Sequence, residues 1–585
     1  MLKSFRIPTV SIVAVCLCLA IGFAGPAAAR SALTDKKGIL QYVPDDTPYL
    51  LATGEPLPDE LLDRMEPRFD EMLKAYQVFL REIVRNSMAK NSADTGADEN
   101  QKMSAIVDEF MTLFSIEGLR NAGFERDSGL VLFGNGILPV LRIELSDPAK
   151  FDDVIERLEA TAGESMKTAE IGGVTYRYVG DEAARLIIGV FAGDAVFTIA
   201  PGVLDEDELK LLLGLTPPKK NIARSGRLLD IVKEYDFSEH YVGFIDNHRI
   251  ASIFLGEPTG LDAALIESAE YDPETVSKVC KQEIHEFVGI APRMVFGYGE
   301  IGTEQLNGSL IVEMRADIAQ GLSTLSALVP GLGIDPGGLL SFGMSLNIPA
   351  VYEFVEARLD AMEEDPFECE HFNELQAGVP KGRETLAKPL PPFISGMRGF
   401  NVIVDSLGDY DMTSGAPPEN IDASVVLSMD DAQAAFMMGT MMSPDLAAVD
   451  LQPDGVPVPL ALPQLQAIAK SAYAAMAETA LAISMGSEAR TRVTIVLNAD
   501  SIEPAPIMSA SMDAGTYYEL VSQSLMAEHD EEGNENPLPE SARIALRDAV
   551  LAMGKMYDRM AFDVRFTARG IEMNSTVSLH DEPSL

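Results

Sequence analysis

Tryptophan is absent from this chain of 585 residues, and histidine (6) and cysteine (4) are scarce. The sequence also contains no G-x-S-x-G nucleophile elbow, no H-E-x-x-H zinc motif and no P-loop. The six histidines are scattered along the chain without the spacing that metal ligands need. The sequence therefore predicts no catalytic, cofactor-binding or metal-binding residue and no cofactor, and it favours a protein without enzymatic activity.

Basic residues are also few, because 45 Lys and Arg stand against 90 Asp and Glu, and the formal net charge is −45. A field of this sign repels nucleic acid and anionic bilayers, which argues against nucleic acid as a partner. Hydrophobic residues make up 47% of the chain, which is typical of a globular protein. Its length exceeds what one hydrophobic core supports, so we expect at least two domains.

The start of the chain has the three parts of a secretory signal peptide. Lys3 and Arg6 precede an uncharged run from Ile7 to Ala24, and Ala27 to Ala29 offer the small residues that a signal peptidase needs. An uncleaved anchor is the alternative, since the apolar run is near the lower limit for a membrane span. We predict that residues 1–29 are a cleaved signal peptide, and that the mature protein is periplasmic without a stable transmembrane anchor.

Two cysteines, Cys280 and Cys369, remain after this cleavage. A lone pair in an oxidising compartment indicates a disulfide. A zinc site would need both cysteines together with His285 and His371. His285 lies five residues beyond Cys280 on a predicted helix and so points about 140° away from it, which prevents the two from binding one ion. We predict the disulfide, with zinc or two free thiols as alternatives.

One local pattern recurs five times along the chain. An apolar strand ends at a polar cap, in most cases Asp or Asn, and an amphipathic helix follows, so that the hydrophobic period changes from about 2 to about 3.6. The five segments are Val140–Ala160, Ser309–Leu328, Leu340–Met362, Ala423–Met442 and Ile507–Ala527. Chance recurrence is the alternative, but the repetition favours an internal duplication.

Alternating apolar residues on both sides of short turns predict β-hairpins around these units. Leu186–Ala200 is expected to turn at Gly193-Asp194, and Met560–Leu579 is expected to repeat the hairpin at Met294–Met314. We predict an α+β fold of two similar lobes, each an antiparallel sheet with helices packed on one face.

The predicted lobes have defined limits. The first lobe spans residues 30–335 and contains a helical excursion at 58–117. The second spans residues 336–585 and contains a helical excursion at 460–485, where the Ala-rich segment Leu462–Ser484 is expected to be a helix.

The opening of the mature chain, LQYVPDDTPYLLA at Leu40–Ala52, resembles the start of a family of exported bacterial proteins that are grouped as a domain of unknown function. In that family an apolar strand follows a turn like Leu-Pro-x-Asp-Thr, which Val43–Thr47 match here. Ile143–Asp246 is similar in its order of strand, cap, helix and hairpin. The resemblance implies an architecture and export, and it brings no catalytic residues.

Methionine is abundant, with 27 residues. Four of them lie at i, i+4 spacing in FMMGTMM (Phe436–Met442), a spacing that could hold Cu(I), although no His or Cys is near. Flexible thioethers also line surfaces that adapt to varied apolar partners. We therefore predict an apolar groove in the second lobe, with an ordinary Met-rich core as the alternative. Its candidate residues are Met437, Met438, Met441, Met442, Met553, Met556 and Met560.

These inferences predict an exported, non-enzymatic envelope protein. It would bind a hydrophobic ligand or a polypeptide, such as another envelope protein, or scaffold an assembly. Two alternatives stay open: a hydrolase-type enzyme whose site is built from scattered acidic residues, and a purely structural partner protein that forms oligomers.

Overall fold

A computed structural model describes residues 33–580, except for residues 34, 92–96, 182, 270, 409–419, 444, 467 and 527–537. The predicted signal peptide, residues 1–29, lies outside the described residues. Within the part of the chain that is described, no helix is both long enough and apolar enough to cross a membrane.

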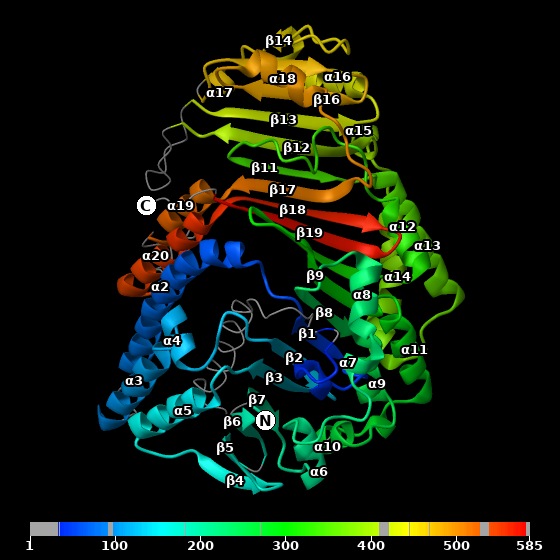
Figure 1. Ribbon diagram of the computed structural model, residues 1–585. Coiled ribbons are helices and arrows are strands. Elements are labelled where there is room, and N and C mark those ends of the chain that lie inside the picture. Colours follow the sequence, from blue (N-terminus) through cyan, green and yellow to red (C-terminus); the bar gives the residue numbers. More distant parts are fainter. Residues whose placement is uncertain are drawn as a thin grey trace.

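The strands form one continuous antiparallel sheet of 19 strands, flanked by helices (Figure 1). The α+β class is confirmed, but the predicted separate sheets of two lobes are fused into one. From its free edge, the first half contributes β4 (Lys167–Ile171), β5 (Val174–Gly180), β6 (Arg185–Phe191), β7 (Asp194–Ala200), β3 (Leu138–Glu144), β2 (Leu130–Asn135), β1 (Tyr49–Thr53), β8 (Tyr241–Asp246), β9 (Arg293–Ile301) and β10 (Gln305–Glu313).

The second half continues the same sheet from β10 to the opposite free edge. In spatial order its strands are β19 (Gly570–Leu579), β18 (Tyr557–Thr567), β17 (Pro506–Asp513), β11 (Leu340–Ser345), β12 (Met397–Ser406), β13 (Asp422–Met429), β16 (Ala480–Met485), β15 (Ala472–Met476) and β14 (Val458–Pro459).

The helices are distributed over both halves. Those of the first half are η1 (Ile39–Tyr42), α2 (Asp59–Asn91), α3 (Ala97–Met111), α4 (Ile116–Asn121), α5 (Pro148–Ala162), α6 (Glu206–Leu212), α7 (Ile222–Ser225), α8 (Arg227–Tyr235), α9 (Asn247–Leu255), α10 (Leu261–Ser268), η2 (Pro273–Thr275), α11 (Lys278–Val288) and α12 (Ala316–Ser323). Those of the second half are α13 (Ile348–Glu364), η3 (Glu370–Phe372), α14 (Asn373–Leu386), α15 (Pro392–Ser395), α16 (Ala432–Met442), η5 (Leu446–Ala448), α17 (Pro463–Gln466), α18 (Ala489–Leu497), α19 (Ala514–Leu525) and α20 (Glu540–Met556).

The two halves have the same strand order. Read from the free edge, β14-β15-β16-β13-β12-β11-β17-β18-β19 matches β5-β6-β7-β3-β2-β1-β8-β9-β10, and β4 is additional. The predicted limit between residues 335 and 336 falls between α12 and β11, where the chain passes from one half to the other. A matched order is what an internal duplication would produce, and the duplication itself stays a prediction.

Helices cover both faces of the sheet, so the prediction of helices on one face is wrong. In β3 the consecutive residues Val140 and Leu141 are both buried. Val140 packs in a core with Ile231 of α8, whereas Leu141 packs with Phe197 on the side of α5. An uninterrupted apolar run of this kind is typical of a strand that is buried on two sides. We name each face after one helix that covers it. The α8 face is the side of Val140, and the α2 face is the side of Leu141, which both α5 and α2 cover.

The second half is covered in the same way. Phe436 of α16 packs with Ile483 on the α2 face. Val493 of α18 packs with Val426 on the α8 face. The Ala-rich segment Leu462–Ser484, which the sequence predicts to be a helix, instead contains the short helix α17 and the hairpin β15–β16. The small side chains of Ala475 and Ala482 let α18 approach the sheet closely, so tertiary packing overrides helix propensity here.

The five predicted strand-to-helix junctions are confirmed. Asp147, Asn347, Asp431 and Asp513 each cap the helix that follows by accepting a hydrogen bond from a backbone N–H of its first turn. The junction after β10 differs, because Asp317 lies in the first turn of α12 and pairs with Arg315. The first predicted helical excursion, residues 58–117, contains α2, α3 and the start of α4.

Cys280 and Cys369 are joined by a disulfide, so the zinc and free-thiol alternatives are wrong. Cys280 lies on α11, and Cys369 directly precedes η3. The carboxylate of Glu283 accepts hydrogen bonds from the backbone N–H of Glu368 and of Cys369, at 2.8 and 3.0 Å. The disulfide therefore ties the first half of the chain to the second, and the two hydrogen bonds of Glu283 lie beside it.

Candidate functional site

A cavity of about 650 Å³ lies between α2 and the α2 face of the sheet, where the two halves meet. Ligand pockets in proteins typically measure about 300–1,000 Å³ and are lined mostly by apolar side chains. Figure 1 shows α2 crossing this part of the molecule beside α20. The cavity is therefore built from both halves of the chain.

Helix α2 forms the wall of the cavity that lies opposite the sheet. Its lining residues repeat at spacings of three and four, which places them on one side of the helix. They are Leu62, Met65, Phe69 and Met72. The helix is held at its start by Leu61, which is fully buried in a cluster with Met556 and Leu579 of the second half. Lys555 of α20 adds an ion pair to Glu71, at 2.7 Å.

The sheet supplies an aromatic wall and a low floor. Tyr241 of β8 and Tyr298 of β9 contact each other edge to face, with ring centroids 5.7 Å apart, and Phe296 lies beside them. The floor is low because Gly308 of β10 is paired on one side with Tyr298 and on the other with Ser575 of β19. A glycine and a serine at adjacent positions fill little volume, and the space above them stays open.

The charged lining residues of the cavity are Glu66 and Arg126. Arg126 pairs with Asp63 at 2.7 Å and with Glu66 at 3.3 Å, and Glu66 also accepts a hydrogen bond from Arg120 at 2.8 Å. Two carboxylates thus face two guanidinium groups. Because these charges are balanced, the described residues that line the cavity include no unpaired cation for an anionic ligand and no unpaired carboxylate for a cationic one.

Two half-buried phenols, Tyr298 and Tyr557, give the cavity neutral polar groups. Burial raises the pKa of Tyr298, and burial together with neighbouring phenols raises the pKa of Tyr557 to about 12. Both groups therefore keep their protons at neutral pH. A neutral phenol can donate and accept a hydrogen bond, which suits an alcohol, ester or amide.

The predicted methionine residues are divided between two distant places. Met556 lines the cavity, and Met553 is half-buried on the same helix, but Met560 belongs to strand β18. Met437 and Met441 lie on α16 and are 53% and 86% exposed, Met438 is half-buried there, and the side chain of Met442 lies outside the described residues. Strands β12, β11 and β17 separate α16 from β18, so the two stripes do not face each other across one groove (Figure 1).

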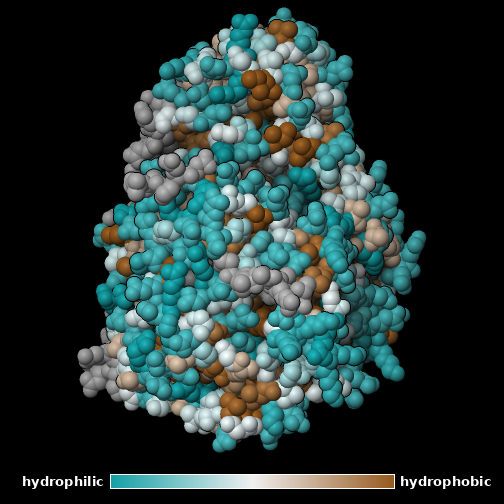
Figure 2. Space-filling view, viewed as in Figure 1, coloured by the Kyte–Doolittle hydropathy of each residue, from teal (hydrophilic) through white to brown (hydrophobic). Residues whose placement is uncertain are grey.

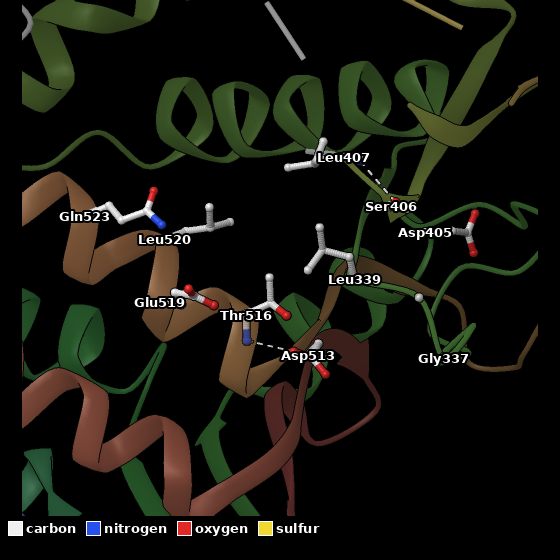
Figure 3. A pocket seen from close by; sticks show the side chains of 12 residues that line it. Gly337, Leu339, Asp405, Ser406, Leu407, Asp513, Thr516, Glu519, Leu520 and Gln523 are labelled. Atoms are coloured by element: carbon white, nitrogen blue, oxygen red, sulfur yellow. Dashed lines mark hydrogen bonds between the residues drawn. The ribbon is translucent and has the colours of Figure 1, made fainter. Parts of the chain in front are cut away.

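A second hollow of about 460 Å³ lies at the ends of β12 and β17, beside α19. Figure 3 shows Leu339, Leu407 and Leu520 projecting into it from three segments, whereas the carboxylate of Asp405 points away. Asp405 pairs with Arg492 at 2.9 Å, and Asp513 caps α19. Two of the three acidic residues that line this hollow, Asp405 and Asp513, thus have structural roles. Among the described side chains, no group of three or more His, Cys, Asp or Glu is placed to hold a metal ion.

Figure 2 shows the face of the molecule that is drawn in Figure 1. Its outer surface is mostly hydrophilic, and its hydrophobic side chains gather in several separate patches. The apolar lining of the half-open cavity is therefore the better candidate for a binding site. Local sequence patterns predict the helical excursion that contains α2 and the hairpin of Tyr298 and Gly308. They do not predict Ser575, because it joins Gly308 through pairing of β10 with β19, far apart in the chain.

No protein-family model, curated protein or solved structure matches the chain. The family resemblance of Leu40–Ala52 stays a prediction. In the structure this segment forms η1 and β1, and its Thr47 side chain is buried. The Thr47 hydroxyl donates a hydrogen bond to the carbonyl oxygen of Gly134 at 2.7 Å, so the motif fixes the entry to the sheet.

Proposed function

We propose that this protein is an exported, non-enzymatic envelope protein that binds a hydrophobic small molecule in the cavity between α2 and the sheet. The observation that carries the proposal is a half-open apolar cavity of about 650 Å³, lined by residues of both halves. Transfer of an apolar molecule from water into such a space is favourable in proportion to the area it removes from water. Export rests on the predicted signal peptide.

The polar residues of the cavity favour a ligand with an uncharged polar group. The charges of Glu66 and Arg126 are already matched by their neighbours. The phenols of Tyr298 and Tyr557 stay protonated, because burial raises the pKa of each. A neutral hydroxyl, ester or amide on the ligand can exchange hydrogen bonds with these phenols without bringing an unpaired charge into the cavity.

The proposal is tested with N-phenyl-1-naphthylamine, an uncharged fluorescent probe, added to delipidated mature protein. We expect one probe to bind per chain. Ser575→Trp places an indole over the low floor beside Gly308, and it should weaken binding by roughly tenfold or more because the probe loses apolar contacts. Ser575 is exposed to this space, so the larger side chain does not displace the core.

The matched control is Ser575→Ala, which keeps the cavity open and should bind the probe like the unaltered protein. Thermal melting of both variants verifies that the fold is kept. A probe that binds the Ser575→Trp variant as tightly as the unaltered protein would place its site elsewhere and contradict the proposal.

A further inference from the structure

The α2 face carries an open strip of apolar side chains beyond the cavity. The strip lies on strands β19, β18, β17 and β11, between the helices that cover the cavity and α16. Large side chains here are unusually exposed for a sheet surface. They include Leu340 (39%), Phe342 (38%), Met344 (41%), Phe562 (37%) and Met573 (38%). Phe562 and Met573 also line the cavity, so the strip and the cavity form one continuous apolar surface.

The strand register identifies one row of directly paired residues that crosses this surface, and we call this row the trough. Starting at Tyr298, directly paired residues on successive strands are Gly308, Ser575, Phe562, Ala510 and Phe342. Three of them, Gly308, Ser575 and Ala510, have small side chains, whereas Phe562 and Phe342 are large and are 37% and 38% exposed. From β10 to β11 the trough crosses four strand spacings, or about 19 Å at ~4.8 Å each.

A row of apolar side chains flanks the trough on each side. One row consists of Leu310, Met573, Val564, Met508 and Met344, and the other of Leu306, Val577, Met560, Met512 and Leu340. Five of these ten residues are methionine, whose flexible thioether can repack around an apolar chain. Of these five methionines, Met560 alone is among the residues that the sequence predicts for an apolar groove.

An acyl chain fits this trough better than a polypeptide does. Each of the strands that form it is paired on both sides, so it has no free edge to which a peptide could add as a strand. The backbone N–H and C=O groups of a peptide would be left against apolar side chains without partners. A hydrocarbon chain has no such groups. The trough is also comparable in length with an acyl chain that spans half of a bilayer core, about 15 Å.

We infer that the ligand is a lipid with one long acyl chain and an uncharged polar group. This inference rests on the proposed function of the cavity. The polar group lies at Tyr298 and Tyr557, and the chain passes over Gly308 and Ser575 and leaves the cavity along the trough toward Phe342.

The inference is tested with a series of monoacylglycerols (octanoyl, dodecanoyl and hexadecanoyl) that compete with N-phenyl-1-naphthylamine. In the unaltered protein the affinity should rise through the whole series, by up to about fourfold for each methylene that is removed from water. Phe342→Asp places a charge in the trough but leaves the cavity intact. Since Phe342 is 38% exposed, the fold should tolerate this change. Hexadecanoyl glycerol should then bind at least about tenfold more weakly, with octanoyl glycerol unchanged.

Phe393→Asp is the matched control, because Phe393 is 44% exposed on α15, outside the trough. It should leave the whole series unchanged. Anionic hexadecanoate should bind more weakly than hexadecanoyl glycerol, because no cation among the described lining residues of the cavity is unpaired.

Three results would overturn the inference. Equal chain-length dependence in the Phe342→Asp and unaltered proteins would remove the trough from the ligand site, while the cavity proposal would stand. Failure of octanoyl glycerol and the probe to bind the unaltered protein would contradict the cavity proposal itself. Binding of an uncharged apolar peptide that depends on Phe342, without dependence on acyl chain length, would assign the trough to a polypeptide.

Discussion

Ser309 and Asn574 face each other at the centre of the nine residue pairs that join β10 to β19, and the Ser309 hydroxyl donates a 2.8 Å hydrogen bond to the Asn574 side chain. The two residues are 265 positions apart and occupy corresponding edge strands of the two halves. Pairing of corresponding edges is the arrangement that joins two copies in a symmetric dimer. In this chain it makes one sheet from two halves and places the cavity at their junction.

The position of Ser309 in this junction lets us predict how substitutions there change the free energy of unfolding. Ser309→Pro should lower the free energy of unfolding by roughly 2 kcal/mol or more, because β10 is paired on both sides and proline removes a backbone donor. Ser309→Ala removes only the side-chain bond and should cost about 1 kcal/mol. Denaturant unfolding monitored by circular dichroism measures both values. Equal losses of unfolding free energy for Ser309→Pro and Ser309→Ala would contradict the claim that the backbone pairing of β10 holds the two halves together.

The disulfide should stabilise the association of the two halves. Cys280 and Cys369 are 89 residues apart, so the chain-entropy model predicts a loss of about 4–5 kcal/mol when both are replaced by Ser. The melting temperature should fall equally when the unaltered protein is reduced. Two titratable thiols in the denatured, unreduced protein would show that the bond does not form.

Arg142 is the largest side chain that is fully buried. It pairs with Asp194 at 2.6 Å and lies over the ring of Tyr42 at 3.6 Å. Burial already raises the pKa of Asp194, against the effect of Arg142. Arg142→Met should therefore cost about 3–5 kcal/mol in unfolding free energy, because it leaves a buried carboxylate without its partner.

The control is Arg315→Met, which removes a half-exposed partner from Asp317 and should cost less than about 1 kcal/mol. Denaturant titration of the two variants compares the costs. A cost for Arg142→Met as small as that of the control would contradict a structural role for the buried pair.

The lowered pKa of Asp335 leads us to expect that the stability of the fold depends on pH. Burial acts to raise its pKa, but hydrogen bonds from Arg559, the Gly337 backbone N–H and Ser511 outweigh burial and hold the pKa below its ordinary value of 3.8. The folded state therefore binds the proton less tightly than the unfolded state does. The resulting stability is fully present above the ordinary pKa and is lost as the pH falls below it.

Asp335→Asn should remove this contribution, which we expect to be about 1 kcal/mol because the pair is partly exposed. The difference in unfolding free energy between the two proteins should be constant above about pH 5 and shrink in more acidic solution. Urea unfolding across this range measures the difference. A difference that does not change with pH would show that the charge of Asp335 is not involved.

The local sequence predicts much of the secondary structure, because caps and hydrophobic periods act over a few residues. Asp147, Asn347 and Asp513 each cap a helix as predicted. The same reasoning fails for Leu462–Ser484, where alanine favours a helix locally but serves as the small contact surface under α18. The prediction of the disulfide succeeds because only two cysteines remain after the predicted cleavage.

The candidate site is harder to predict from local sequence patterns than the secondary structure is. Its α2 wall follows a helical apolar stripe, but its floor depends on the β10–β19 register, which no local pattern specifies. Methionine spacing predicts residues that do not lie together, since Met437 and Met441 lie on α16, whereas Met508 and Met573 lie in the row beside the trough.

The central claim is that the cavity at the junction of the halves holds the apolar part of a ligand. A crystal structure of the mature protein with a monoacylglycerol brominated along its chain tests this claim most directly. The account predicts an anomalous bromine signal between α2 and the β10–β19 pair, within contact distance of Leu310 or Met573. A bromine signal confined to other parts of the molecule, with no ligand density in the cavity, would contradict it.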